Sequence, residues 1–122
     1  MSIDTEFADV MVQDCWVLGW RTENDSLVFD IEASLISGHP LYESPKPGEW
    51  SCYKTAQIVF SGVREVSGLL PIQSVRATVD PDGSVDYGSI DSISQETNGF
   101  AIVGEFGNVL VSASAVRLHL AA

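Results

Sequence analysis

The sequence predicts a mainly β protein, an antiparallel β-sandwich or partly open barrel of about seven or eight strands with little helix. Three observations predict this fold class. Apolar residues alternate with polar ones along short segments, as they do in strands with one wet face. Turn-forming pairs and stretches rich in glycine or proline separate these segments. No segment of a dozen residues sustains the apolar stripe of a helix.

The first hairpin is the clearest element of the chain. Apolar residues alternate with others through 16–21 and again through 27–35, on either side of the polar turn 23–26. Such alternation predicts two antiparallel strands. Trp16 and Trp20 share a strand face, and large aromatic residues at alternate positions usually fill a core. We therefore expect both tryptophans in the core.

Prolines and glycines interrupt the middle of the chain. Residues 36–51 hold three prolines and two glycines, a density that excludes a central strand or a helix interior and predicts the longest loop. Residues 52–63 are rich in apolar and β-favouring side chains and predict a strand that ends near Gly62. Near the start of the chain, residues 5–13 fit either a helix or a strand and stay undecided.

A turn motif follows the segment 72–79. The sequence Asp80-Pro81-Asp82-Gly83 places proline at the first central position and glycine where a positive φ is needed, which predicts a type I turn with a bulge. Residues 85–94 then return as the partner strand. The alternating aspartates resemble a calcium loop, but the glycine is misplaced for an EF-hand and no glutamate stands at the expected distance. We interpret the motif as a plain hairpin turn.

Two further turn motifs divide the C-terminal part of the chain. Asn98-Gly99 suits a two-residue primed turn, and Gly107-Asn108 suits a type II′ turn that closes the strand 100–106. Residues 109–120 are expected to complete that hairpin. Their apolar positions change from odd to even numbers, which predicts a bulge or bend near residues 115–116.

The composition is typical of one domain with an acidic surface. The chain has 122 residues, 45% hydrophobic and 19% charged, so we expect a single domain, 1–122, with a substantial core. Its 17 acidic and 6 basic side chains give a net charge of −11. Such a chain repels phosphate, which argues against nucleic acid and anionic membranes as partners and favours a basic protein. The opening residues contain no basic leader with an apolar stretch behind it, so a cytoplasmic location is expected.

The loop 36–51 supplies the candidate site. Binding residues often lie on long loops that a rigid β scaffold positions. The candidate binding residues are aromatic and ionisable side chains between the prolines: His39, Tyr42, Glu43, Glu49 and Trp50. The alternative is a flap that covers a sheet edge, anchored by Leu41 and Trp50. Trp50 is the tryptophan expected at the surface because of its loop position.

No catalytic or metal-binding residue is predicted. The chain lacks a G-x-S-x-G elbow and a phosphate-binding glycine loop, so we assign no catalytic residue and no cofactor. Cys15, Cys52, His39 and His119 carry zinc-binding groups, but they lack the local pairing of a structural zinc site. We interpret both cysteines as small buried hydrophobic residues.

Four segments carry a resemblance to a known class of proteins. They are Asp14-Cys15-Trp16, Leu27 through Ala33, Ile58 through Val63, and Gly104 through Val109. In these strand-and-turn patterns the chain resembles small uncharacterised bacterial β-rich proteins, some of them similar to immunity proteins of toxin systems. No functional residue is carried over from this resemblance. It implies an acidic protein that neutralises a toxin.

These observations lead to three functional hypotheses. The first is a non-enzymatic protein-interaction domain, in its most concrete form an immunity-like inhibitor of a basic toxin. The second is a small-molecule-binding protein or an enzyme with a cleft under the loop 36–51. The third is a self-associating β domain, which makes a homo-oligomer.

Overall fold

The computed structural model describes residues 3–121. Over that range the chain forms ten strands in three antiparallel sheets, none closed into a barrel, which confirms the predicted β-sandwich. No helix in this range is long and apolar enough to span a membrane. The elements, in chain order, are α1 (Ile3–Glu6), the 3-10 helix η1 (Val12–Asp14), β1 (Trp16–Glu23), β2 (Ser26–Leu35), β3 (Cys52–Ser61), β4 (Glu65–Ser67), the 3-10 helix η2 (Ile72–Ser74), β5 (Thr78–Val79), β6 (Val85–Asp86), β7 (Ile90–Glu96), β8 (Gly99–Gly104), β9 (Gly107–Ser112) and β10 (Ala115–Leu120).

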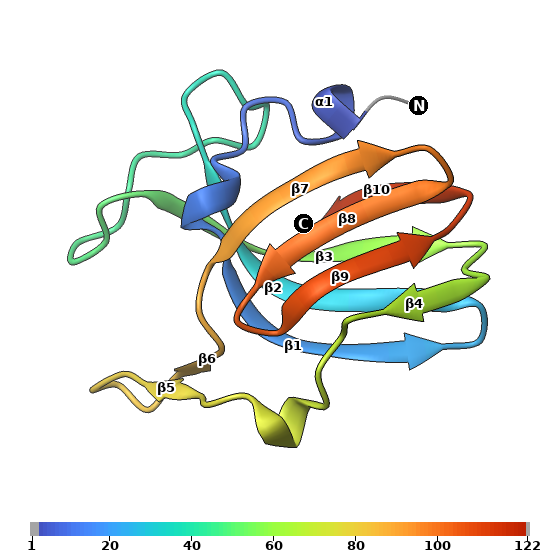
Figure 1. Ribbon diagram of the computed structural model, residues 1–122. Coiled ribbons are helices and arrows are strands. Elements are labelled where there is room, and N and C mark those ends of the chain that lie inside the picture. The colour runs from blue at the N-terminus through green and yellow to red at the C-terminus, as the bar shows by residue number, and fades with distance from the viewer. Residues whose placement is uncertain (1–2, 122) are drawn as a thin grey trace.

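Two four-stranded sheets lie one above the other (Figure 1). Sheet A has the strand order β1-β2-β3-β10, and sheet B has the order β4-β9-β8-β7. Their inner faces share one cluster of buried hydrophobic side chains. Aromatic rings lie at its centre: the ring centroids of Phe29 and Phe106 are 4.9 Å apart, and those of Phe60 and Trp20 lie 6.2 and 6.3 Å from Phe29. Tilted ring pairs of this kind add to the stabilisation that burial provides.

The β1–β2 hairpin forms as predicted but contains a bulge. The strands pair along their length, and Asn24 takes a positive φ of 55° in the turn. The register shifts between Val17 and Gly19. Because side chains alternate along a strand, a shift of one residue places Trp16 and Trp20 on opposite faces of sheet A. Trp20 packs against the core, whereas the prediction that Trp16 fills the core is wrong.

The predicted strand 72–79 is wrong over most of its length. Its first three residues form η2, and only β5 at its end pairs with β6. Ile72 and Val75 are both half-buried and lie three residues apart, which is the repeat of a 3-10 helix rather than of a strand. The turn between β5 and β6 has the predicted form, with an N–H···O bond of 2.9 Å from Gly83 to Asp80 and a φ of 88° at Gly83.

The predicted turn at residues 107–108 lies two residues too late. Gly104 pairs with Gly107, so the turn consists of residues 105–106. Phe106 is fully buried there. Gly107 is required for a different reason, since it has a φ of 125° and a Cβ on it would lie 2.1 Å from the carbonyl oxygen of Gly68. The role of Gly107 is therefore to allow two backbone segments to come into contact, and it does not form the turn.

The predicted turn Asn98-Gly99 lies one residue too late. Glu96 pairs with Gly99, so the turn consists of Thr97-Asn98, and neither of these has the positive φ of a primed turn. A Cβ on Gly99 would lie 1.9 Å from the carbonyl oxygen of Val111. Here too the glycine serves a close approach between neighbouring strands.

The segment 109–120 does not complete one hairpin. Its first part lies in β9 of sheet B, and its last part is β10, which pairs with β3 in sheet A. The change of the apolar positions from odd to even numbers therefore marks the place where the chain crosses from sheet B to sheet A, and the predicted bend lies there. The outer edge of β10 is capped from α1, because the carboxylate of Glu6 accepts a 2.7 Å hydrogen bond from the N–H of Leu118.

Both cysteines are buried free thiols, as predicted. Cys15 precedes β1 and Cys52 begins β3. Burial raises the pKa of the Cys15 thiol to about 11, so the thiol is protonated at neutral pH. A protonated, buried thiol is a poor nucleophile, and Cys15 acts as a packing residue.

Candidate functional site

A cleft with a volume of about 510 Å³ opens at one end of the sandwich. Its floor is the outer face of sheet A, where Trp16, Glu32 and Tyr53 lie on adjacent strands. The β5–β6 hairpin forms one wall, and the last residues of the loop 36–51 line it as well. Both segments project from the same end of the molecule (Figure 1). The cleft thus joins four parts of the chain that are distant in sequence.

Carboxylates supply all the charged side chains in the described lining of the cleft. Five contribute to it, from β2, the loop and the hairpin: Glu32, Glu49, Asp80, Asp82 and Asp86. None of the described lining residues is basic. Burial raises the pKa of Glu32, and the charges of the other four carboxylates raise it further. A concave surface lined by one sign of charge concentrates its field and attracts cations.

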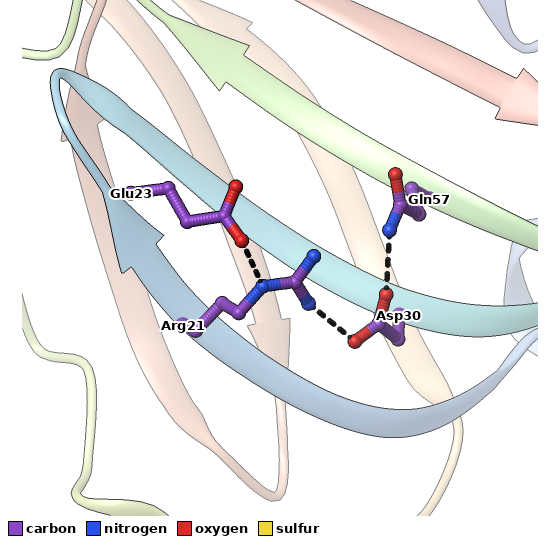
Figure 2. Close-up of polar contacts among 4 residues, drawn as sticks. All are labelled: Arg21, Glu23, Asp30 and Gln57. Carbon is purple, nitrogen blue, oxygen red and sulfur yellow. Dashed lines mark hydrogen bonds and ion pairs between the residues drawn. The ribbon is translucent and has the colours of Figure 1, made fainter.

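The charge in the cleft differs from the charge farther along the same face. Asp30 lies two residues from Glu32 and is fully partnered (Figure 2). Its carboxylate accepts a 2.5 Å contact from Arg21 Nη1 and a 3.0 Å hydrogen bond from Gln57 Nε2, while Arg21 Nε also contacts Glu23 at 2.5 Å. Within residues 3–121 the Glu32 side chain forms no hydrogen bond or ion pair. Negative charge is therefore balanced beside the cleft and unbalanced inside it.

A hydrogen-bond network ties the loop to the floor of the cleft. The phenol of Tyr53 donates to the carboxylate of Asp14 at 2.9 Å and accepts from the indole of Trp50 at 3.2 Å. Burial raises the pKa of Tyr53, and the bond donated to Asp14 raises it too, so the phenol keeps its proton. Trp50 is 86% exposed and is nevertheless held in place.

The network continues inward from Asp14. The hydroxyl of Ser34, a fully buried side chain on β2, donates to the Asp14 carboxylate at 3.0 Å. Ser34 also shares a 2.6 Å hydrogen bond with Ser51 at the end of the loop. The end of the loop is therefore fixed from two sides, by Ser51 and by Trp50.

The structure brings two of the five predicted site residues to this cleft. Glu49 lines it, and Trp50 is bonded to Tyr53 on its floor. His39 lies elsewhere, where its Nδ1 accepts a 3.0 Å hydrogen bond from the N–H of Leu41. Tyr42 and Glu43 line a separate hollow of about 290 Å³.

Glu43 is occupied with neighbouring strand residues. Its carboxylate pairs with the ammonium group of Lys54, and this contact lowers the pKa of Glu43. Its N–H points at the sulfur of Cys52 at 3.4 Å. These contacts fasten the early part of the loop to β3. The loop thus has a fastened part and a part that borders the cleft.

The sequence did not identify the floor of the cleft. The signal that could have found Glu32 and Tyr53 is the alternation itself, which places both on the wet face of their strands. The aspartates of the β5–β6 turn were interpreted only as turn residues. Two of them do act within the turn, since Ser84 donates to Asp80 and Asp82, and the bond to Ser84 lowers the pKa of Asp82. They also line the cleft.

The chemistry of the cleft suits a charged organic group better than a metal ion. Within residues 3–121, no group of three or more His, Cys, Asp or Glu side chains is placed to hold a metal. The carboxylates instead come from separate walls, beside the aromatic rings of Trp16 and Tyr53. An ammonium or guanidinium group is attracted by both kinds of surface.

Replacing Tyr53 with phenylalanine tests the network. The change removes the donor to Asp14 and the acceptor of the Trp50 indole, so we expect the free energy of unfolding to fall by about 1 kcal/mol or more. Urea denaturation measures this. The matched control is Tyr42→Phe, because Tyr42 forms no side-chain hydrogen bond within the described residues. Equal losses in the two variants would show that the network has no stabilising role.

Comparison with protein-family models, with curated proteins and with solved structures gives no match for this chain. The geometry and charge of the cleft are therefore the basis for a functional assignment.

Proposed function

We propose that this protein is a non-enzymatic interaction domain that binds a basic protein partner through the acidic cleft. One observation carries the proposal: a cleft of about 510 Å³ is lined by five carboxylates and, among its described residues, by no basic side chain. Complementary charge steers association and excludes wrong partners. The bound group is a lysine or arginine side chain that the partner presents on its surface.

The state of Glu32 supports this proposal. A half-buried carboxylate without a cationic partner is unfavourable for the folded protein, and burial together with four neighbouring carboxylates raises its pKa. Carboxylates whose pKa is raised by burial and by like charges gather at functional sites. A cation that enters the cleft gives Glu32 an ion-pair partner, as Arg21 does for Asp30.

Apolar side chains around the cleft support a protein as the occupant. Trp50 is 86% exposed next to the floor, and on the hairpin Val79 and Val85 are 67% and 42% exposed. Tryptophan is enriched among the residues that dominate protein interfaces. Because Tyr53 holds its indole, Trp50 loses little conformational entropy when a partner covers it.

The most concrete version of the proposal is an immunity-like inhibitor of a basic toxin. A toxin that acts on nucleic acid needs basic residues at its working surface. A chain with a net charge of −11 and an acidic cleft is complementary to such a surface. Binding there blocks the access of nucleic acid.

A cationic small molecule is the second candidate occupant. The volume of the cleft falls in the range of about 300–1,000 Å³ that is usual for small-molecule sites. Its place beside Gly48 and Glu49, at the end of the loop 36–51, agrees with the cleft expected for such a protein.

Calorimetric titration with an oligo-arginine peptide tests the proposal. We expect binding at low salt and an affinity that falls as ionic strength rises to about 0.15 M, because salt screens the charges outside the most buried part of the cleft. An oligo-glutamate peptide of equal length is the control and is expected not to bind. Free arginine amide that binds as tightly as the peptide would favour the small-molecule candidate. No binding of either cation at low salt would contradict the acidic cleft as a site.

A further inference from the structure

A tryptophan and a carboxylate lie side by side on the floor of the cleft. Trp16 on β1 is the direct cross-strand partner of Glu32 on β2, and both side chains line the cleft. Side chains opposite each other on one face of an antiparallel pair have Cβ atoms about 5 Å apart. A cation that reaches the Glu32 carboxylate from the cleft therefore also meets the indole ring of Trp16.

A second aromatic ring borders Glu32 from the other side. Glu32 pairs with Thr55 on β3, and Tyr53 lies two residues from Thr55, so the Tyr53 ring occupies the diagonal position on the same face. The Tyr53 hydroxyl is already engaged, since it donates to Asp14. What Tyr53 adds to the cleft is therefore an aromatic surface rather than a hydrogen-bond donor.

This arrangement suits a guanidinium group better than an ammonium group. A guanidinium is planar, stacks on aromatic rings and donates two N–H bonds to one carboxylate, so it contacts the indole face and Glu32 at the same time. An ammonium group is compact and strongly hydrated, so it gives up more hydration when it enters a half-buried site. Cation–π contacts in proteins also involve arginine more often than lysine.

The same face of sheet A contains an example of guanidinium recognition. Arg21 donates from Nε to Glu23 and from Nη1 to Asp30, so one guanidinium serves two carboxylates (Figure 2). In the cleft the carboxylates also stand on different walls, with Glu32 on the floor and Glu49 on the loop. The five N–H groups of a guanidinium can be shared among such carboxylates.

We infer that the cleft selects arginine over lysine, with the guanidinium plane stacked on the indole of Trp16 and its N–H edge donating to the carboxylate of Glu32. This inference rests on the proposed function and narrows it, because it names which basic side chain the partner inserts. Trp16 carries no charge, so its loss changes the preference between the two cations more than the attraction that both share. Leu18 and Val85, which also line the cleft, give the methylene stem of the arginine an apolar surface.

Calorimetric titration with oligo-arginine and oligo-lysine peptides of equal length tests the inference. We expect the unmodified protein to bind oligo-arginine about tenfold more tightly than oligo-lysine at low salt. Trp16→Leu removes the aromatic ring and is expected to reduce this ratio to about twofold or less, by weakening the binding of oligo-arginine. Trp16→Phe keeps a ring and is expected to retain most of the ratio.

Trp50→Leu is the matched control, because Trp50 is an exposed tryptophan that does not belong to the described lining of the cleft. It is expected to leave the ratio of the two affinities unchanged. Circular dichroism of each variant confirms that the fold is retained.

The inference and the proposed function fail in different ways. Equal affinities of the two peptides for the unmodified protein overturn the arginine preference and leave the acidic cleft as a binding site. The role of Trp16 is overturned if Trp16→Leu keeps the full preference, or if Trp50→Leu lowers it as much as Trp16→Leu does. Failure of both peptides to bind at low salt contradicts the proposed function itself.

Discussion

The double substitution Glu32→Gln with Glu49→Lys is expected to weaken binding of an oligo-arginine peptide about a hundredfold at low salt. The two residues approach the cleft from its floor and from the loop. The first change removes the half-buried negative charge, and the second replaces attraction by repulsion at the margin. Calorimetric titration under the conditions used for the unmodified protein gives the ratio of affinities.

The control for this experiment is Asp4→Asn with Asp91→Lys. It changes the net charge by the same amount at exposed positions that do not line the cleft. If binding depends only on overall charge, both double variants lose the same affinity and the cleft is not the site. A loss confined to the Glu32 and Glu49 variant locates binding in the cleft.

Glu32→Gln alone separates function from stability. Burial raises the folded-state pKa of Glu32 above its unfolded value, so the folded state holds the proton more tightly than the unfolded state does. The contribution of Glu32 to the free energy of unfolding is therefore most favourable below the unfolded pKa. It is lost as the pH rises through the folded-state pKa, because the side chain then ionises inside the folded protein. At neutral pH the neutral glutamine is expected to raise the melting temperature while it weakens peptide binding. A purely structural role for Glu32 predicts the opposite effect on stability.

Phe106→Ala is expected to lower the free energy of unfolding by about 3–5 kcal/mol, which is a large part of the total stability of a domain. The Phe106 ring is fully buried in the β8–β9 turn of sheet B and packs against two rings of sheet A, with centroids 4.9 Å from Phe29 and 5.9 Å from Trp20. It also packs over Gly104, where a Cβ would lie 2.5 Å from the ring. Removal of the ring leaves a cavity between the sheets.

Urea denaturation compares this variant with two others. Phe106→Leu keeps most of the volume and is expected to lose less, which gives a folded reference if the alanine variant does not fold. Leu110→Ala, at an exposed site a few residues away, is expected to change stability by about 0.5 kcal/mol or less. A loss for Phe106→Ala no greater than that for Leu110→Ala would show that the ring is not central to the core.

Much of the fold could be predicted because burial imposes alternation on strands. The β1–β2 hairpin, β3 and the loop 36–51 all lie where the pattern of apolar residues and breakers places them. The predicted turns failed at Gly99 and Gly107 because glycine has two uses. A glycine that takes a positive φ and one that lets two backbones meet look identical in a sequence, and only the folded chain distinguishes them.

The candidate site could be predicted only in part. Glu49 and Trp50 lie on a loop, and loop position alone indicates them. Trp16 was misplaced because Trp16, Val17 and Leu18 are consecutive apolar residues, so a shift of register within them leaves no trace in the pattern. The hairpin wall was missed because nothing in the order of residues indicates that it folds back beside β1.

The passage of the chain from β9 to β10 has a consequence for synthesis on the ribosome. Sheet A receives its fourth strand only after every strand of sheet B has been made, since β10 follows β9 and pairs with β3. Until then the edge of β3 that β10 will occupy is open to other nascent chains. A pairing between segments so distant in sequence also forms slowly. Newly made molecules are therefore most exposed to aggregation just before the final strand emerges, and a chaperone that shields β3 would act in that interval.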